Sequence, residues 1–178
     1  MEQSGPVSTP IDPKSYLHKA TDDELPVDQN LYQQIISVLI YLVTCTHPDL
    51  AFCISYLSQF SSCPLNFHHT AVKRVFRYIS GTRSYVLIYP RSGSVKLEGF
   101  LDASFANCLD TRRSYTGYVF QLEKCTISWY SKKQQCISNS TTEAEYIALS
   151  MTARQAKWYT HAFKQFNINI PVQLYYNN

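Results

Sequence analysis

Residues 115–130, YTGYVFQLEKCTISWY, decide the fold class of the chain. β-Branched and aromatic side chains fill two runs within this stretch, residues 115–122 and 126–130, and such side chains favour strands. The short step that joins the two runs, residues 122–125, is compatible with a hairpin. The stretch therefore predicts two antiparallel strands in the second half of the chain.

The segments before and after this hairpin extend the predicted sheet. Upstream, apolar residues alternate with other residues, which is typical of half-buried strands. The apolar members of this pattern are Val86, Ile88, Val95, Leu97 and Leu101. Downstream, residues 172–176 predict one further strand close to residue 178.

A long helix is expected before that further strand, from Thr141 to about Phe166. Ser140 and Glu143 match a capping box at its start. Its apolar stripe is predicted to consist of Ala144, Ile147, Ala148, Met151, Trp158 and Ala162. Three antiparallel strands, a long helix and one further strand make an α/β (or α+β) layer.

Residues 31–83 show the periodicity of helices instead. Asp28 or Asn30 is the expected cap of a first helix, and Pro48-Asp49 is expected to start a second. A third helix is expected from about residue 66 to residue 80. Its apolar face holds Val72, Val75, Phe76 and Ile79, and its opposite face holds Lys73, Arg74 and Arg77.

The first thirty residues differ from the rest in composition. Residues 1–30 contain four prolines and no apolar periodicity, which predicts a flexible acidic linker. They hold six acidic and two basic residues, a net charge of −4, whereas residues 31–178 hold seven acidic and fourteen basic residues, a net charge of +7. A basic body favours a polyanionic partner such as nucleic acid. No Asp or Glu follows Glu145, so a site built from several carboxylates must draw them from earlier positions.

Several other classes of protein are not expected. The polar first ten residues do not resemble a secretory signal, and the longest apolar stretch, residues 35–43, is about half of the roughly 20 residues that span a membrane. We therefore expect a cytoplasmic or nuclear protein without membrane contact, and we expect its six cysteines to be free thiols. The sequence has no Gly-x-Ser-x-Gly elbow, which argues against nucleophilic catalysis, and no glycine-rich phosphate-binding loop. We expect no small-molecule substrate.

Several motifs in order resemble copia-type retrotransposon Pol polyproteins. The helical part carries THPDLAFCISYLSQF (46–60) and AVKRVFRYISGT (71–82), which are similar to the connection at the carboxy-terminal end of the reverse transcriptase. PVSTPIDP (6–13) is similar to the stretch that precedes this connection. The later motifs resemble the ribonuclease H domain of the same polyproteins: LDASFA (101–106), DTRRSYTGYVF (110–120), ISWYSKKQ (127–134) and STTEAEYIAL (140–149).

This resemblance implies three parts. Residues 1–30 are a linker, residues 31–83 a reverse-transcriptase connection, and residues 84–178 a ribonuclease H-like fold that is truncated at its C-terminal end. In such enzymes about four carboxylates hold two Mg²⁺ or Mn²⁺ ions, which activate a water and stabilise the leaving oxygen as RNA in an RNA–DNA hybrid is cut. The expected partners are such a hybrid and other polymerase fragments.

The resemblance also assigns two carboxylates as catalytic residues and metal ligands. Asp102 matches the first catalytic Asp of the family, and Glu145 matches the catalytic Glu. Glu143 competes with Glu145 for this role, although its place three residues after Ser140 also suits a helix cap.

The remaining ligand positions depart from the family pattern. Ser104 stands where a second Asp is frequent, and Asn177 occupies the third catalytic position, where Asp is usual. The fourth carboxylate of the family lies on a segment beyond residue 178. An Asn offers a carbonyl oxygen but no negative charge, so we expect Mg²⁺ or Mn²⁺ to bind weakly or not at all.

Basic residues in three places are candidates for contacts with the hybrid backbone, or else a solvated surface. They are Lys73, Arg74 and Arg77 on the third helix, and Arg112, Arg113, Lys132 and Lys133 beside the strands. Two hypotheses follow. The chain is either an impaired ribonuclease H-like endonuclease or a catalytically inactive relic that at most binds nucleic acid or a polymerase partner.

Overall fold

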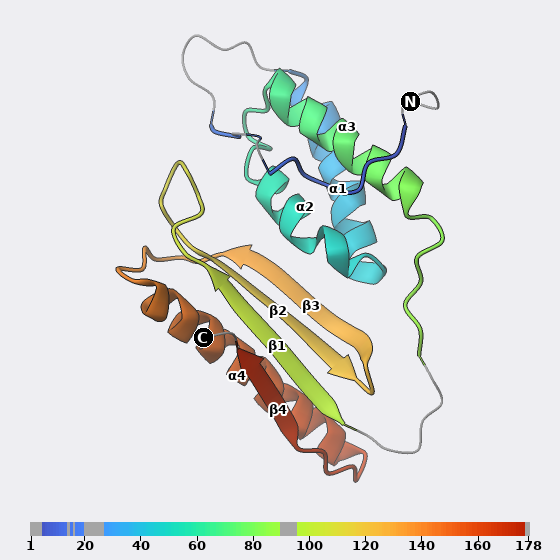
Figure 1. The fold of residues 1–178 in the computed structure, drawn as a ribbon, viewed down its shortest axis with the longest axis vertical. Coiled ribbons are helices and arrows are strands. Elements are labelled where there is room, and N and C mark those ends of the chain that lie inside the picture. Colours follow the sequence, from blue (N-terminus) through green and yellow to red (C-terminus); the bar gives the residue numbers. More distant parts are fainter. Residues whose placement is uncertain (1–4, 14, 16, 20–26, 90–95, 177–178) are drawn as a thin grey trace. The chain divides into compact units, whose positions relative to one another are not determined.

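The computed structural model describes residues 5–13, 15, 17–19, 27–89 and 96–176. It divides the chain into two compact units, residues 1–86 and 87–178 (Figure 1). The first unit is helical and the second is built around a four-stranded sheet. None of the helices in the described ranges is both long enough and apolar enough to cross a bilayer.

The helical unit contains α1 (Gln29–Cys45), a short 3₁₀ turn (Pro48–Leu50), α2 (Ala51–Ser58) and α3 (Asn66–Gly81). Asp28, one of the two predicted caps, begins α1: its Oδ1 accepts a hydrogen bond of 3.1 Å from the Leu31 N–H. The helices bury a common apolar core, whose fully buried members include Tyr32, Leu39, Leu50, Leu57, Val72 and Val75. Apolar periodicity therefore identified these elements correctly.

The side chain of His68 lies in that core and caps the N-terminal end of α3. Its side chain is fully buried, its Nδ1 accepts a hydrogen bond of 3.0 Å from the Leu65 N–H, and its ring stacks on Phe60 at a centroid distance of 3.9 Å. Its Nε2 lies 3.0 Å from the carbonyl oxygen of His18. The imidazole therefore caps a helix and ties the N-terminal segment to it.

Other described residues of the predicted linker also pack on these helices. Leu17 is buried, and its carbonyl accepts a hydrogen bond of 3.0 Å from the Tyr56 hydroxyl. Pro6 lies against Gly81, where an added Cβ would approach the Pro6 Cβ to 2.8 Å. In its described part the segment 1–30 therefore belongs to the helical unit, because its carbonyls and a few apolar side chains find partners there.

The second unit contains β1 (Leu97–Ser104), β2 (Tyr115–Leu122), β3 (Cys125–Lys133), α4 (Thr141–Gln165) and β4 (Val172–Tyr176). The strand order is β3-β2-β1-β4, with β1, β2 and β3 antiparallel and β4 parallel to β1. This is the predicted α/β layer, and it is consistent with the predicted truncated ribonuclease H-like fold. The predicted hairpin is confirmed: Glu123 and Lys124 both have positive φ, as a two-residue turn between twisted strands requires.

Helix α4 covers one face of this sheet (Figure 1). Leu97 of β1 and Phe120 of β2 are fully buried against it, together with Ala156 and Ile170. The buried stripe of the helix consists of small residues at four-residue spacing: Ala144, Ala148, Thr152 and Ala156. Small side chains let the helix approach the sheet closely.

Two expectations from apolar patterning are wrong. Trp158 was assigned to the apolar stripe of α4 but is 59% exposed, because the stripe follows the four-residue spacing from Ala144 and Tyr159 takes the inward position instead. Val86 and Ile88 form no strand and are about 70% exposed. Within the described residues, this segment is joined to the start of β3 by hydrogen bonds from Cys125 Sγ to the Ile88 carbonyl and from the Tyr89 hydroxyl to the Thr126 carbonyl. The third residue of that alternation, Val95, lies outside the described residues.

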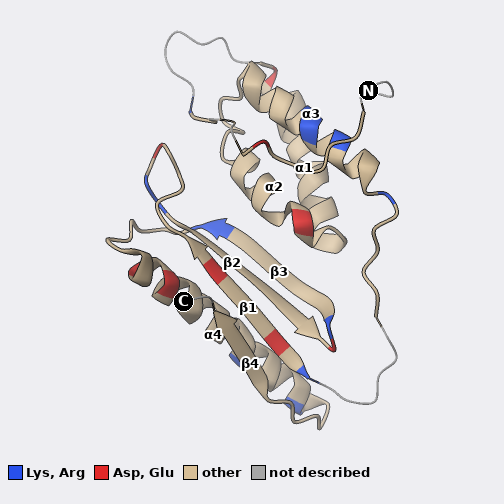
Figure 2. Ribbon diagram, viewed as in Figure 1, with Lys and Arg blue, Asp and Glu red and all other residues tan. Residues whose placement is uncertain are grey.

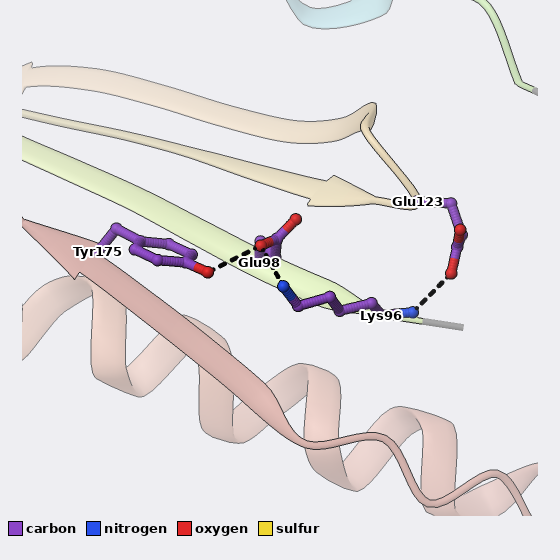
Figure 3. A network of polar contacts seen from close by, with 4 residues as sticks. All are labelled: Lys96, Glu98, Glu123 and Tyr175. Carbon is purple, nitrogen blue, oxygen red and sulfur yellow. Dashed lines mark hydrogen bonds and ion pairs between the residues drawn. The ribbon is translucent and has the colours of Figure 1, made fainter. Parts of the chain in front are cut away.

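A polar network joins β4 to β1 on the same sheet (Figure 3). Glu98 Oε1 accepts hydrogen bonds from Lys96 Nζ at 2.7 Å and from the Tyr175 hydroxyl at 2.9 Å. Glu123 Oε1 accepts a further bond from the Lys96 N–H at 2.9 Å. The hydrogen bonds from Lys96 and Tyr175 hold the pKa of Glu98 below its ordinary value.

Candidate metal and nucleic-acid site

Asp102 and Glu145 line the same cavity, of about 200 Å³. Asp102 lies near the C-terminal end of β1, and its neighbour Leu101 pairs with Tyr176 at the end of β4. Glu145 lies in the second turn of α4, the helix that packs on β1. The full lining is Leu101, Asp102, Thr142, Glu145, Tyr146, Leu149 and Tyr176. The fold therefore brings together the two carboxylates that the sequence predicted as a pair.

Glu143, the competing carboxylate, makes capping hydrogen bonds at the start of α4. Its N–H donates a hydrogen bond of 3.1 Å to Ser140 Oγ, as a capping box requires. Its Oε2 accepts from the Asn139 N–H at 2.7 Å and from Asn139 Nδ2 at 3.1 Å, one residue earlier than the motif predicts. Glu143 therefore caps the helix, and Glu145 is the carboxylate that lines the cavity.

The donors around this cavity fit one Mg²⁺ or Mn²⁺ ion better than two. Mg²⁺ is commonly held by one or two carboxylates with several waters retained. Asp102 and Glu145 supply two such carboxylates, and no cluster of three or more His, Cys, Asp or Glu side chains suited to a metal occurs within the described ranges. Asn177, the predicted third position, lies outside those ranges.

Both predicted basic pairs of the second unit lie at the end of the sheet that carries Asp102. Lys133 pairs with Tyr115, and Lys132 pairs with Thr116, while Arg112 and Arg113 lie in the loop just before β2. Because Asp102 pairs with Gly117, both pairs lie within a few residues of the Asp102 level in the sheet. Figure 2 shows Lys and Arg at this end of β3.

Cys108 holds the loop between β1 and β2 against β3. Its Sγ receives a hydrogen bond of 3.1 Å from the Thr111 hydroxyl and lies 3.6 Å from Lys133 Nζ. Burial raises the pKa of the Cys108 thiol, but the hydrogen bonds from Thr111 and the charge of Lys133 outweigh it, so the pKa lies below its ordinary value. Arg112 follows in this loop with a positive φ, and its side chain is exposed.

The basic residues of α3 have partners within the helical unit. Arg74 donates from Nε to the Thr9 carbonyl at 3.1 Å and from Nη2 to Thr9 Oγ1 at 2.9 Å. Arg77 donates from Nε to the Gly5 carbonyl at 2.8 Å. Lys73 is exposed, whereas the two arginines are half-buried. The N-terminal segment therefore accepts hydrogen bonds from two of the guanidinium groups that the sequence predicted as phosphate contacts.

A larger groove, of about 530 Å³, lies between β3 and α4 and was missed by the sequence reasoning. Lys132 and Lys133 contribute from β3, and Tyr146 and Arg154 contribute from α4. The signal for the helical side was present, because residues 146, 150 and 154 recur at four-residue spacing. Its pairing with β3 depends on the register of helix against sheet, which spacing alone does not give.

Known proteins similar to this chain place it in a family. It is 34% identical over 174 residues to the retrovirus-related Pol polyprotein from transposon TNT 1-94 of Nicotiana tabacum, and 35% identical over 177 residues to that from transposon RE2 of Arabidopsis thaliana. These matches cover 95% and 97% of this chain. The chain belongs to the copia-type retrotransposon Pol family. It spans only 13% and 12% of those two Pol polyproteins.

The chain also matches a shorter protein, over most of the length of that protein. The chain is 43% identical over 129 residues to the secreted RxLR effector protein 161 of Plasmopara viticola, a match that includes 72% of this chain and 91% of that protein. No family model and no solved structure matches the chain. Membership in the Pol family therefore rests on pairwise similarity and agrees with the predicted resemblance.

Proposed function

We propose that this member of the Pol family binds RNA–DNA hybrids and cuts their RNA strand slowly, through a ribonuclease H-like site with two carboxylates. The observation that carries the proposal is the shared cavity of Asp102 and Glu145, at the end of the sheet where Lys132, Lys133 and Arg112 gather. Carboxylates suit a hard cation, and basic side chains at the same end of the sheet suit phosphates. We place this activity in the cytoplasm or nucleus, where RNA–DNA hybrids are found.

Each group has a separate role in this proposal. Asp102 and Glu145 would hold Mg²⁺ or Mn²⁺ and accept hydrogen bonds from water in the cavity. When bound, the ion supplies Lewis-acid polarisation of the phosphodiester and a more acidic water. Lys132 and Arg112 would bind the phosphates of the hybrid and position the scissile bond over the carboxylates.

Slow turnover follows from the charge of the site. Two carboxylates balance one divalent cation but leave a pair of such ions with excess positive charge. Ser104 and Asn177 add no charge at the positions where the family has further carboxylates. We therefore expect weak metal binding and hydrolysis that is slower than in a site with four carboxylates.

A second candidate function is nucleic-acid binding without cleavage. It is favoured by the lack, within the described ranges, of any group of three or more side chains suited to a metal. The basic residues at the same end of the sheet support binding equally well in either case. The two candidates therefore differ only in whether the carboxylates support turnover.

Cleavage of a labelled hybrid separates them. The full chain is incubated with an RNA–DNA hybrid, labelled on the RNA, in Mg²⁺ or Mn²⁺, and the products are resolved by size. We expect slow cutting that Asp102→Asn and Glu145→Gln each abolish, with hybrid binding retained. Cutting that survives both substitutions would point to a contaminating nuclease, and a wild-type chain that binds without cutting would establish the second candidate.

A further inference from the structure

The groove between β3 and α4 joins cationic and aromatic side chains from two elements. Lys132 and Lys133 line it from the end of β3, and Arg154 lines it from α4. Tyr130 and Tyr146 add aromatic surface, and Met151 adds an apolar floor. Lys132 and Arg154 are exposed, so their charges face solvent.

The groove has an excess of positive charge. Glu143 is its acidic residue, and the Glu143 carboxylate already accepts two hydrogen bonds from Asn139. Lys133 lies 3.6 Å from Cys108 Sγ, so its position is held by the loop between β1 and β2. Three cations against one engaged carboxylate favour an anionic occupant.

The groove lies next to the carboxylate cavity, because the two share one lining side chain. Tyr146 lines both, and it is 67% exposed. From Tyr146 to Arg154 the helix rises roughly 12 Å, which is about the rise of three to four nucleotides in one strand of a duplex. Arg154 therefore lies roughly 12 Å along the helix from the residue that the groove shares with the cavity.

We propose that this groove binds the sugar-phosphate backbone of one nucleic-acid strand, over three to four nucleotides beyond the Asp102–Glu145 cavity. The proposal rests on the proposed function, because the same strand would enter that cavity. Lys132 and Arg154 bind phosphates from opposite sides of the groove, and Tyr146 offers a ring on which a base stacks at the junction. The mixture of aromatic rings and cations favours a nucleic-acid strand over an acidic peptide, which offers no bases to stack.

Binding of a fluorescent RNA–DNA hybrid, followed by anisotropy in EDTA over a range of salt concentrations, tests the groove without requiring cleavage. The variant Lys132→Ala/Arg154→Ala should bind the hybrid about tenfold more weakly and lower the log–log salt slope by about 1 to 2. Lys157→Ala is the matched control, because Lys157 is an exposed cation on the same helix that does not line the groove. It should bind within about twofold of the wild-type chain.

Cys136 provides a second readout of position. Its thiol is exposed and lines the groove, whereas the exposed Cys45 and Cys63 belong to the helical unit. In a chain carrying Cys45→Ser and Cys63→Ser, a hybrid with an activated disulfide tether on one backbone phosphate should undergo thiol–disulfide exchange with Cys136. The Cys136 sulfur bonds to the tether, and the small thiol of the tether leaves. Adding Cys136→Ser should abolish the cross-link.

The outcomes separate the groove from the proposed function. Unchanged binding by Lys132→Ala/Arg154→Ala would overturn the groove assignment together with the phosphate contact of Lys132, and a missing cross-link at Cys136 would overturn the groove assignment alone. In either case, cleavage that still requires Asp102 and Glu145 would leave the catalytic part of the proposed function standing. Groove-dependent binding without any cleavage would support the assignment and remove the catalytic part of the proposed function. Failure of the wild-type chain to bind the hybrid, or stronger groove-dependent binding of a poly-glutamate peptide, would overturn the assignment of a nucleic-acid strand.

Discussion

Asp102 on β1 and Glu145 on α4 line one cavity, although the β2–β3 hairpin separates them in the chain. Their approach depends on the packing of α4 against β1, which places the first turns of the helix beside the end of the strand. Two carboxylates in one cavity suit a divalent cation, and Lys132 and Lys133 at the same end of the sheet suit phosphates. The pair is therefore the most informative target for mutation.

Glu143 and Glu145 should respond differently to substitution. Glu143→Ala removes the acceptor for two hydrogen bonds from Asn139 and should lower the free energy of unfolding by about 1 kcal/mol, a typical value for a lost cap. Glu145→Ala should change stability by less than about 0.5 kcal/mol, because it is a partly exposed helix position. Urea unfolding and hybrid cleavage, measured on both variants, check this. Lost cleavage in Glu143→Ala with normal cleavage in Glu145→Ala would reverse the assignment.

Gly99 should tolerate no side chain. A Cβ added there would lie 2.6 Å from Leu174 Cδ2 and 2.7 Å from Phe120 Cε1, and Phe120 is fully buried. Gly99→Ala should therefore cost about 1–3 kcal/mol of stability through overpacking. Gly117→Ala on the neighbouring strand is the control, because its Cβ would lie 3.7 Å from the Tyr130 carbonyl. Equal urea midpoints for both variants would show that the core rearranges at Gly99.

Tyr78 should contribute stability that disappears at high pH. Its hydroxyl donates a hydrogen bond of 2.7 Å to Asp49 Oδ2, and burial together with this neighbour raises the pKa of Tyr78 to about 12. Tyr78→Phe should lose about 1 kcal/mol at neutral pH. An unfolded tyrosine ionises near pH 10, so the wild-type advantage is complete below that pH and declines as the pH rises toward 12.

Urea unfolding at pH 7 and at about pH 11 measures this decline. Tyr41→Phe is the control for loss of a hydroxyl, because Tyr41 is 72% exposed on α1. An advantage of the wild-type chain over Tyr78→Phe that is the same at both pH values would contradict the role of the hydrogen bond to Asp49.

Removal of residues 1–10 should strengthen nucleic-acid binding. It releases Arg74 from Thr9 and Arg77 from Gly5, so both guanidinium groups become available to phosphates. We expect tighter binding of the hybrid at low salt, with a log–log salt slope steeper by about 1 to 2. The same deletion combined with Arg74→Ala and Arg77→Ala should show no gain. A gain that persists in this combined variant would place the added contacts elsewhere.

Local residue patterns predicted most elements of this protein. The hairpin follows from residues 115–130, and the strand at 172–176 has the predicted bounds, because runs of β-branched and aromatic residues suit a half-buried strand wherever it pairs. Ser140 and Glu143 predicted the start of α4 for an equally local reason: capping hydrogen bonds join residues three or four apart. Asp102 and Glu145 came from motif resemblance, and no local rule placed them together.

The errors arose where burial depends on distant partners. Val86 and Ile88 alternate like a strand but find no ladder, and Trp158 has the spacing of a core residue but is exposed, since the sheet meets α4 along Ala144, Ala148 and Ala156.

The sequence by itself determined the family, most of the helices and strands, and the two candidate carboxylates, because each is encoded in short runs of residues. Only the tertiary structure decided which residues meet. The register of α4 on the sheet makes Tyr146 a wall of both the carboxylate cavity and the basic groove. Docking of residues 5–9 along α3 likewise engages Arg74 and Arg77. Both results depend on the packing of side chains across separate elements, which no pattern along a single segment specifies.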